Sequence, residues 1–298
     1  MIRTALLLAG AGLALSGCVV DASVTQAPPA PAAAPAPGGV PPGMQYLYGS
    51  GEAAALSVQA YNVLVDWVRA RLEPVQGVAP RKSVVFAQGA SLASPRVQTC
   101  GTKPPAVVFD VDETLLLNLG YEGDDAQRSG GWDSARWDRW EKTGAMKVAA
   151  VPGALDAVRA LRAMGVTVIF NTNRAAASAE QTEAALNFAG LGPARHGETL
   201  FLKGDVDGKS GKDARRDAIA QRWCVVAMGG DQLGDFTDLF AGLSPPERRA
   251  AAASPAIAPY WGHGWFVLPN PVYGTGLGST YDQTFPSATR WTDPQEKH

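Results

Sequence analysis

Short apolar runs alternate with amphipathic stretches along the chain between residues 105 and 268. The apolar runs have the length of buried strands and span residues 106–109, 166–170, 199–202, 224–228 and 265–268. Helical periodicity marks the stretches between them, residues 152–164, 178–188 and 212–223. Strands that alternate with helices of these lengths predict an α/β fold with a doubly wound parallel sheet. We expect residues 265–268 to form an edge strand of this sheet.

The N-terminal segment has the pattern of an export signal. Arg3 precedes an apolar stretch, residues 5–15, that is too short to span a bilayer as a mature helix. The segment ends in Leu-Ser-Gly-Cys18, which resembles the lipobox of bacterial lipoproteins. We therefore expect a signal peptide over residues 1–18 and a lipid anchor on Cys18. Because Val19 follows the cysteine in place of aspartate, we expect the outer membrane, with the folded domain in the periplasm.

Residues 19–43 are rich in proline and alanine. Such a composition forms no apolar core and predicts a semi-extended tether between the anchor and a folded domain over residues 44–298. From Glu52 onward a helical period appears. It places one set of apolar side chains on a face that we expect to pack against the sheet, namely Leu56, Ala60, Val63, Leu64, Trp67, Val68 and Leu72.

Charge and residue counts exclude several classes of protein. The formal net charge is −2 and no basic cluster occurs, so a nucleic acid polymer is not expected as a partner. The three histidines are scattered without ligand spacing, which argues against a zinc site. The three cysteines form no Cys-x-x-Cys pair, so a redox motif is not expected. The sequence leaves the oligomeric state open.

Polar and acidic residues follow three of the expected strands. Asp110 and Asp112 come directly after the central strand, residues 171–174 follow the next, and Asp231 and Asp235 follow the strand at 224–228. Open parallel sheets bind their ligands at the carboxyl ends of the strands. Alternation along an extended chain sends Asp110 and Asp112 in the same direction. Two like charges held so close indicate a site that uses a cation or a proton.

This set of residues suits phosphoryl transfer. Three carboxylates form an all-oxygen ligand set for Mg²⁺, namely Asp110, Asp231 and Asp235. Thr172 and Lys212 supply a hydroxyl group and a cation that can hold a phosphoryl group. Asp110 can attack phosphorus to form an aspartyl-phosphate, and Asp112 can protonate the leaving oxygen and later activate water.

The same residues carry a resemblance to a known family. In order, Asp110-x-Asp112-x-Thr114, Thr172, Lys212 and Asp231-x-x-x-Asp235 resemble the four motifs of the haloacid dehalogenase superfamily. The surrounding segments, including Thr172-Asn-Arg174 and the stretch from Leu268 to Gly274, are similar to bacterial class C acid phosphatases. The resemblance covers roughly residues 52–278 and agrees with the lipobox, since many of those proteins are outer-membrane lipoproteins.

The resemblance implies a Rossmann-like core with a small cap, here at about residues 117–150, and Mg²⁺-dependent hydrolysis of small phosphomonoesters, often 5′-nucleotides. By match, Asp110 is the nucleophile, and Asp112 is the acid/base and also a metal ligand through its carbonyl. Asp231 and Asp235 complete the metal site. The implied phosphate-binding residues are Thr172, Asn173 and Lys212, and Lys209 competes with Lys212 for the motif position.

An aromatic cluster in the expected cap allows two interpretations. Tyr121, Trp132, Trp137 and Trp140 lie close together in the sequence, and they can form the core of a small subdomain or offer an aromatic face to a substrate. Tyr121 is the favoured substrate contact because it lies nearest to the aspartates. The segments that carry the resemblance add Arg174 and Tyr273 as candidate contacts.

Three questions stay open at this point. Cys100 precedes the first core strand and Cys224 begins a strand that neighbours it in the superfamily, so the two can form a disulfide or remain free thiols. A phosphotransferase, in which an alcohol replaces water, would use the same site as a phosphatase. A catalytically silent surface lipoprotein that binds a ligand is the third possibility, although a binding protein has no need of Asp112.

Overall fold

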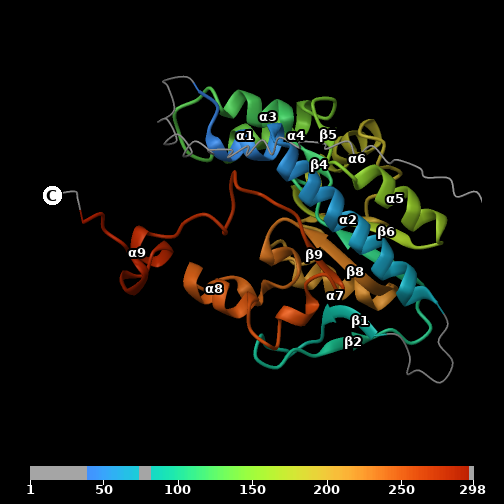
Figure 1. Cartoon of the computed structure of the whole chain (residues 1–298). Coiled ribbons are helices and arrows are strands. Elements are labelled where there is room, and N and C mark those ends of the chain that lie inside the picture. Colours follow the sequence, from blue (N-terminus) through green and yellow to red (C-terminus); the bar gives the residue numbers. More distant parts are fainter. Residues whose placement is uncertain (1–38, 74–81, 295–298) are drawn as a thin grey trace, which may run out of the picture. The chain divides into compact units, whose positions relative to one another are not determined.

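A five-stranded parallel sheet forms the centre of the folded part of the chain (Figure 1). The computed structural model describes residues 39–73 and 82–294, so the signal peptide, the lipidation site at Cys18 and most of the tether lie outside the described residues. In spatial order the strands are β7 (Leu200–Lys203), β6 (Thr167–Ala175), β3 (Pro105–Phe109), β8 (Cys224–Gly230) and β9 (Trp265–Val267). The predicted α/β fold, the central position of β3 and the edge position of β9 are confirmed.

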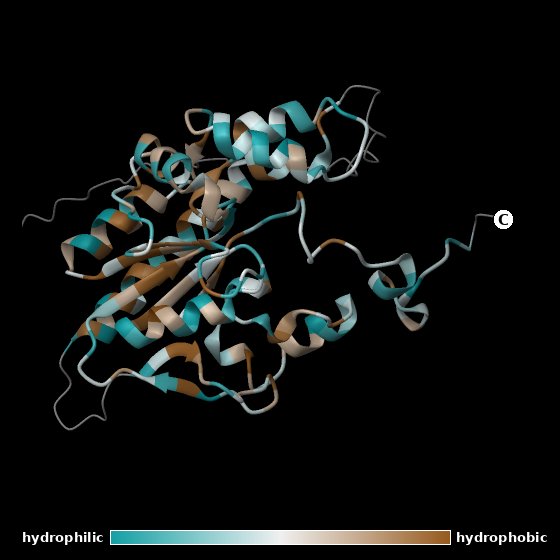
Figure 2. Ribbon diagram, turned by 180° about the vertical axis from the view of Figure 1, so that it is seen from behind, coloured by the Kyte–Doolittle hydropathy of each residue, from teal (hydrophilic) through white to brown (hydrophobic). Residues whose placement is uncertain are grey.

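Helices and a small hairpin cover both faces of this sheet. Val107 and Phe109 of β3 face a core shared with α2 (Gly51–Leu72), α5 (Ala154–Ala163) and α6 (Ala179–Phe188). Ala106 and Val108 face a second core, formed with β1 (Lys82–Phe86) and α7 (Asp213–Arg222). Figure 2 shows the central strands as the most hydrophobic part of the ribbon. Burial on both faces explains why the strands are apolar runs without polar alternation.

Helix α2 buries part of the predicted face: Leu64 and Val68 are buried, and Ala60, Trp67 and Leu72 are partly buried against the core. The buried residues are Ala53, Ser57, Tyr61, Leu64 and Val68, whereas the predicted Leu56 and Val63 are 45% and 44% exposed. The Tyr61 hydroxyl donates to the Thr114 carbonyl behind the first aspartates, which favours burial of the tyrosine stripe. Apolar periodicity alone missed Ser57 and Tyr61 because both carry hydroxyl groups.

The chain between β3 and α5 forms a separate small unit. Strand β4 (Leu116–Leu117) pairs antiparallel with β5 (Ala149–Ala150). Two helices lie between these strands in the sequence, α3 (Leu119–Asp125) and α4 (Ser134–Thr143). The β4–β5 pair therefore returns the chain to the sheet after α4, beside the point where it left β3.

The ends of the described region differ from the expected boundaries. Helix α1 (Pro42–Gly49) begins two residues inside the expected tether, and the side chains of Met44 and Leu47 are buried. Strand β6 extends beyond the predicted end at residue 170 and continues through residues 171–174 to Ala175. The remaining strand is β2 (Val97–Thr99), which pairs with β1, and the remaining α-helices are α8 (Pro245–Ala252) and α9 (Tyr281–Thr284).

Within residues 39–73 and 82–294, no helix is long and apolar enough to cross a membrane.

Cys100 and Cys224 form a disulfide bond, with their Cα atoms 4.7 Å apart. Cys100 precedes β3 and Cys224 begins β8, and these two strands are neighbours in the sheet. The bond joins the amino ends of this pair, remote from the carboxyl ends where the aspartates lie. Of the two alternatives left open by the sequence, the structure has the disulfide.

Candidate active site

Asp110 lies where β3 ends, between two neighbouring strands and a buried lysine. Its backbone N–H donates to the Gly229 carbonyl of β8 at 3.0 Å, which fixes the start of the loop. Lys212, at the start of α7, is 5% exposed, and its Nζ donates to carboxylate oxygens of Asp110 and of Asp235, the latter at 2.7 Å. Lys209 is exposed. Of the two competing lysines, the structure therefore brings Lys212 into contact with Asp110.

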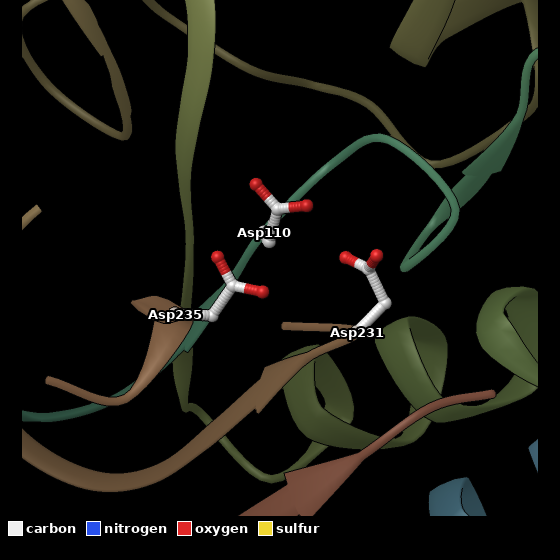
Figure 3. A group of neighbouring side chains, drawn as sticks. All are labelled: Asp110, Asp231 and Asp235. Atoms are coloured by element: carbon white, nitrogen blue, oxygen red, sulfur yellow. The ribbon is translucent and has the colours of Figure 1, made fainter. Parts of the chain in front are cut away.

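Three carboxylates converge at this edge of the sheet. Asp231 follows β8, Asp235 ends the short helix Leu233–Asp235, and both point toward Asp110 (Figure 3). One oxygen atom of each carboxylate lies within 4.8 Å of the others. Carboxylate oxygens are the ligands that Mg²⁺ and Ca²⁺ prefer, so the donor set fits a hard divalent cation.

Burial and mutual repulsion perturb this group of acids. Burial, followed by the charge of Asp235, raises the pKa of Asp231 to about 7. Burial also raises the pKa of Asp110 well above its usual range, although the Lys212 ammonium group lowers it in part. A divalent cation would remove the like-charge repulsion and keep the acids ionised. The electrostatics and the geometry therefore agree on a cation site.

Asp112 lies beside the cluster and is held by different partners. Its carboxylate accepts hydrogen bonds from Arg174 Nε at 2.9 Å and Nη2 at 2.7 Å, from Asn118 Nδ2 at 2.9 Å and from Thr172 Oγ1 at 3.3 Å. Burial raises the pKa of Asp112, but Arg174, Asn118 and Lys212 together outweigh it, so the pKa lies below the usual value. These contacts orient the carboxylate toward the pocket and favour its charged form.

The structure places two predicted site residues behind Asp112. Arg174 is 2% exposed and does not line the pocket, because its guanidinium group is occupied by Asp112 and Asn118. This position differs from the predicted substrate contact. Thr172 is also fully buried, and its hydroxyl group lies between Asp112 and the Arg174 backbone N–H. Asn173 lines the pocket, and Arg215 Nη2 donates to its Oδ1 at 2.5 Å.

A pocket of about 810 Å³ opens above these residues. Its floor contains the functional groups at the strand ends, namely Asp110, Asp112, Lys212, Asp231 and Asp235. One side of its lining comes from residues 121–141 of α3, α4 and the loop between them, and we call this side the α3–α4 wall. Tyr273 and Met44 line the pocket as well. Residues from both ends of the described chain therefore meet at the site.

The aromatic cluster forms a packed group, and three of its members also line the pocket. Tyr121 is 6% exposed, and its ring contacts Trp137 at 5.0 Å and the Arg136 guanidinium group at 4.1 Å between centres. Most of its surface is therefore used in packing, although it lines the pocket. Trp132 and Trp137 also line the pocket, and Trp132 is 69% exposed. The tryptophans offer more aromatic surface to a ligand than Tyr121 does.

Sequence reasoning missed Glu113, which lies between two motif residues. Glu113 is 1% exposed, and its φ of 55° is in the left-handed region. Its carboxyl group accepts hydrogen bonds from Tyr48 of α1 at 3.2 Å, from the Asn118 N–H at 2.9 Å and from the Tyr273 hydroxyl. Burial, followed by the charge of Asp112, raises its pKa to about 8. Only its place inside the Asp-x-Asp-x-Thr motif could have drawn attention to it.

The parallel sheet with aspartates along one edge agrees with the order of the sequence motifs, which resemble those of the haloacid dehalogenase class. Within that class, the chain belongs to the HAD superfamily, subfamily IIIB (acid phosphatase), whose family model matches residues 69–276.

Similar proteins come from a plant and a bacterium. Acid phosphatase 1 of Solanum lycopersicum is 31% identical over 171 residues, which are 56% of this chain and 57% of that protein. The chain thus spans somewhat more than half the length of this relative. A structure of the class C acid phosphatase from Bacillus anthracis with tungstate bound has a TM-score of 0.63 and 26% identity, and the match covers 82% of this chain and 89% of that one. A second structure of the class C acid phosphatase from Bacillus anthracis has a TM-score of 0.63 and 27% identity, over 78% and 84% of the two chains.

Proposed function

We propose that this protein is a Mg²⁺-dependent acid phosphatase that hydrolyses small phosphomonoesters, 5′-nucleotides among them, through an aspartyl-phosphate. The observation that carries the proposal is the position of Asp110, which lines the pocket beside two further carboxylates and the buried Lys212 ammonium group. Membership of the acid phosphatase subfamily supports the reaction class. Tungstate, which is bound in the Bacillus anthracis relative, is a tetrahedral oxyanion like phosphate.

Asp110, Asp231 and Asp235 would hold the Mg²⁺ ion, with the Asp112 carbonyl as a further ligand. The bound ion supplies positive charge that offsets the negative charge of the phosphoryl oxygens and of the carboxylates. Lys212 contributes a second positive charge through an ammonium group that Asp110 and Asp235 keep in place. Stabilisation of charge on the phosphoryl oxygens is the main requirement of phosphoryl transfer.

In the first step, a carboxylate oxygen of Asp110 attacks phosphorus while the bond between phosphorus and the ester oxygen breaks. Asp112 gives its proton to the departing alkoxide oxygen. Arg174 favours the ionised form of Asp112. A bound phosphate dianion adds negative charge next to Asp112, and this like charge favours the protonated form that the first step needs.

In the second step, Asp112 takes a proton from a water molecule, and the resulting hydroxide attacks phosphorus. The bond between phosphorus and the Asp110 oxygen breaks, which releases inorganic phosphate and restores the carboxylate. The hydrogen bonds from Arg174 and Asn118 suit this step, because they stabilise Asp112 as a carboxylate once the alcohol has left. One residue thus serves as acid and then as base in opposite protonation states.

Residues 117–150 would form the cap of this enzyme. The α3–α4 wall supports this assignment, since it contributes Trp132 and Trp137 to the pocket that contains Asp110. A flat ring such as a nucleobase fits an aromatic lining of this kind. Asn173, which lines the pocket, would donate to a phosphoryl oxygen through the amide nitrogen that Arg215 leaves free.

We further propose that the mature protein is lipidated on Cys18 and attached to the outer membrane, with the catalytic domain in the periplasm. The lipobox and the Pro/Ala-rich segment support this location. An oxidising compartment also suits the Cys100–Cys224 disulfide. A Cys18→Ala variant should move from the membrane fraction to the soluble periplasmic fraction, and its retention in the membrane would argue against the anchor.

The enzymatic proposal is tested by phosphate release from p-nitrophenyl phosphate and 5′-AMP. The purified protein is assayed with Mg²⁺ and with EDTA. Asp110→Asn is assayed in parallel, and Asp156→Asn, the same change at an exposed residue of α5, serves as the matched control.

We expect turnover that requires Mg²⁺, is lost in Asp110→Asn and is retained in Asp156→Asn. A folded protein that releases no phosphate from either compound would refute the proposal. Turnover that persists in Asp110→Asn would refute the assignment of the nucleophile.

A further inference from the structure

Glu122 is a buried acid that faces the pocket without a partner. It lies in the first turn of α3, is 4% exposed and lines the pocket. Its carboxyl group forms no hydrogen bond or ion pair with any residue in 39–73 or 82–294. A carboxylate that is mostly removed from water and has no hydrogen-bond donor is unfavourable, and the Glu122 carboxyl group borders the pocket. The Glu122 carboxyl group can therefore accept a hydrogen bond or bind a positive charge from a ligand in the pocket.

Other acids surround this place, and most of them already have partners. Asp125 lines the same wall and is paired with Arg136, while Glu141 accepts hydrogen bonds from Trp137 Nε1 at 2.6 Å and from the Ala175 N–H. Glu122 is the buried member of this group that remains available. Arg136 of α4 is paired with Asp124 and Asp125 and does not line the pocket. The lining residues of the α3–α4 wall include four acids and no basic residue, so this wall presents negative charge to the pocket.

Aromatic surface lies next to these acids. The rings of Trp132 and Trp137 both line the pocket, with their centroids 5.4 Å apart and their planes inclined by 40°. The faces of tryptophan rings attract cations, and the attraction increases when the cation is partly removed from water. An acidic residue beside such rings favours a positively charged group over a neutral group of the same shape.

We propose that Glu122 is a specificity-determining residue that binds a cationic group, an amine or quaternary ammonium, on the alcohol portion of the phosphomonoester. This inference rests on the proposed function, and it names the class of substrate that the α3–α4 wall prefers. A neutral base with an N–H donor would use the same acceptor but would lack the Coulombic attraction.

Burial, followed by the charge of Asp125, raises the pKa of Glu122 to about 7, and Arg136 lowers it in part. A bound cation would stabilise the ionised form of this acid.

Two esters of nearly identical shape separate the effect of charge from that of size. Phosphocholine carries a trimethylammonium group, and 3,3-dimethylbutyl phosphate has a neutral carbon in place of that nitrogen. Their affinities are measured by calorimetry at pH 8 in the Asp110→Asn protein, which prevents turnover. The same background with Glu122→Gln removes the charge but keeps the size of the side chain. Glu180→Gln, an exposed position on α6, is the matched control.

We expect the parent protein to bind phosphocholine about tenfold more tightly than the neutral ester. Glu122→Gln should reduce this ratio to about twofold or less, and Glu180→Gln should leave it unchanged. Equal affinities in the parent, or a ratio that Glu122→Gln does not change, would overturn the proposal. Inorganic phosphate is titrated into each variant as a check on folding. If Glu122→Gln fails to bind phosphate, the ratio of the two ester affinities in the parent protein decides whether the site prefers a cation.

Turnover of p-nitrophenyl phosphate by protein with Asp110 intact tests the catalytic function separately. If the protein hydrolyses p-nitrophenyl phosphate but Glu122→Gln leaves the ratio of the two ester affinities unchanged, only the role of Glu122 is refuted. Absence of hydrolysis would refute the proposed function, while the binding ratio would still decide whether Glu122 recognises a cation.

Discussion

Glu113 connects three segments that meet at the pocket, so its substitution should reduce the stability of the whole domain. The Tyr48 hydroxyl comes from α1, the Asn118 N–H from the segment after β4, and the Tyr273 hydroxyl from the C-terminal segment. In Glu113→Ala these donors lose their acceptor. A buried donor without a partner destabilises a protein by about 1–3 kcal/mol. Water can reach the partly buried Tyr48 hydroxyl, so two donors dominate, and the expected loss is about 3–5 kcal/mol.

A second variant separates the lost hydrogen bonds from the backbone conformation. The φ of Glu113 is 55°, in the left-handed region, where a residue with a Cβ atom is strained by about 1–2 kcal/mol. Glu113→Gly loses the same hydrogen bonds as Glu113→Ala but relieves this strain. We therefore expect the glycine variant to be about 1 kcal/mol more stable than the alanine variant.

Urea unfolding followed by tryptophan fluorescence gives the free energy of unfolding of both variants and of Glu180→Ala, a control at an exposed residue. The control should lie within about 0.5 kcal/mol of the parent protein. An alanine variant within about 1 kcal/mol of the parent would refute the role of the hydrogen bonds. A glycine variant less stable than the alanine variant would refute the argument from backbone strain.

Three further results are expected. Lys212→Met should lower kcat for p-nitrophenyl phosphate by about 10²-fold or more, because the charge beside Asp110 is lost, and unchanged kinetics would exclude Lys212 from the site. Burial raises the pKa of Glu122 from 4.5 to about 7, so the folded state binds this proton more tightly than the unfolded state does. The resulting stabilisation of the folded state is fully present below pH 4.5 and is lost as the pH rises through 7. Urea unfolding across this pH range should show a smaller loss of unfolding free energy for Glu122→Gln than for the parent protein, and parallel pH profiles of the two would contradict the pKa shift. Removal of the Cys100–Cys224 disulfide by a double serine substitution should lower the free energy of unfolding by about 2–5 kcal/mol, since it closes a loop of more than 100 residues, and unchanged urea unfolding would contradict this.

The strands and the main acids could be predicted because their signals are local. A strand buried on both faces needs an unbroken apolar run, and β3 and β8 both have one. In a parallel sheet the residues that follow such runs meet at one edge, so Asp110 and Asp231 could be placed together before any contact was known. The disulfide could be anticipated as one of two alternatives, because Cys100 and Cys224 adjoin neighbouring strands.

The partners of the charged groups could not be predicted in the same way. Arg174 and Asn173 are adjacent, yet Arg174 binds Asp112 behind the site and Asn173 lines the pocket. Glu113 and Glu122 are buried, as few acids are, and no periodicity in the sequence marks them. The environment of each depends on segments far away in the chain, such as α1 and residues 270–274.

Apolar periodicity and the order of the motifs were therefore sufficient for the α/β sheet, for its active edge and for most of the residues on that edge. Burial and pairing emerged only when distant segments packed together, because the energy of a charged side chain depends on the donors and charges within a few ångströms of it. This applies to Lys212, which contacts Asp110 from 102 positions along the chain, and to Glu122, which no donor in the described residues reaches.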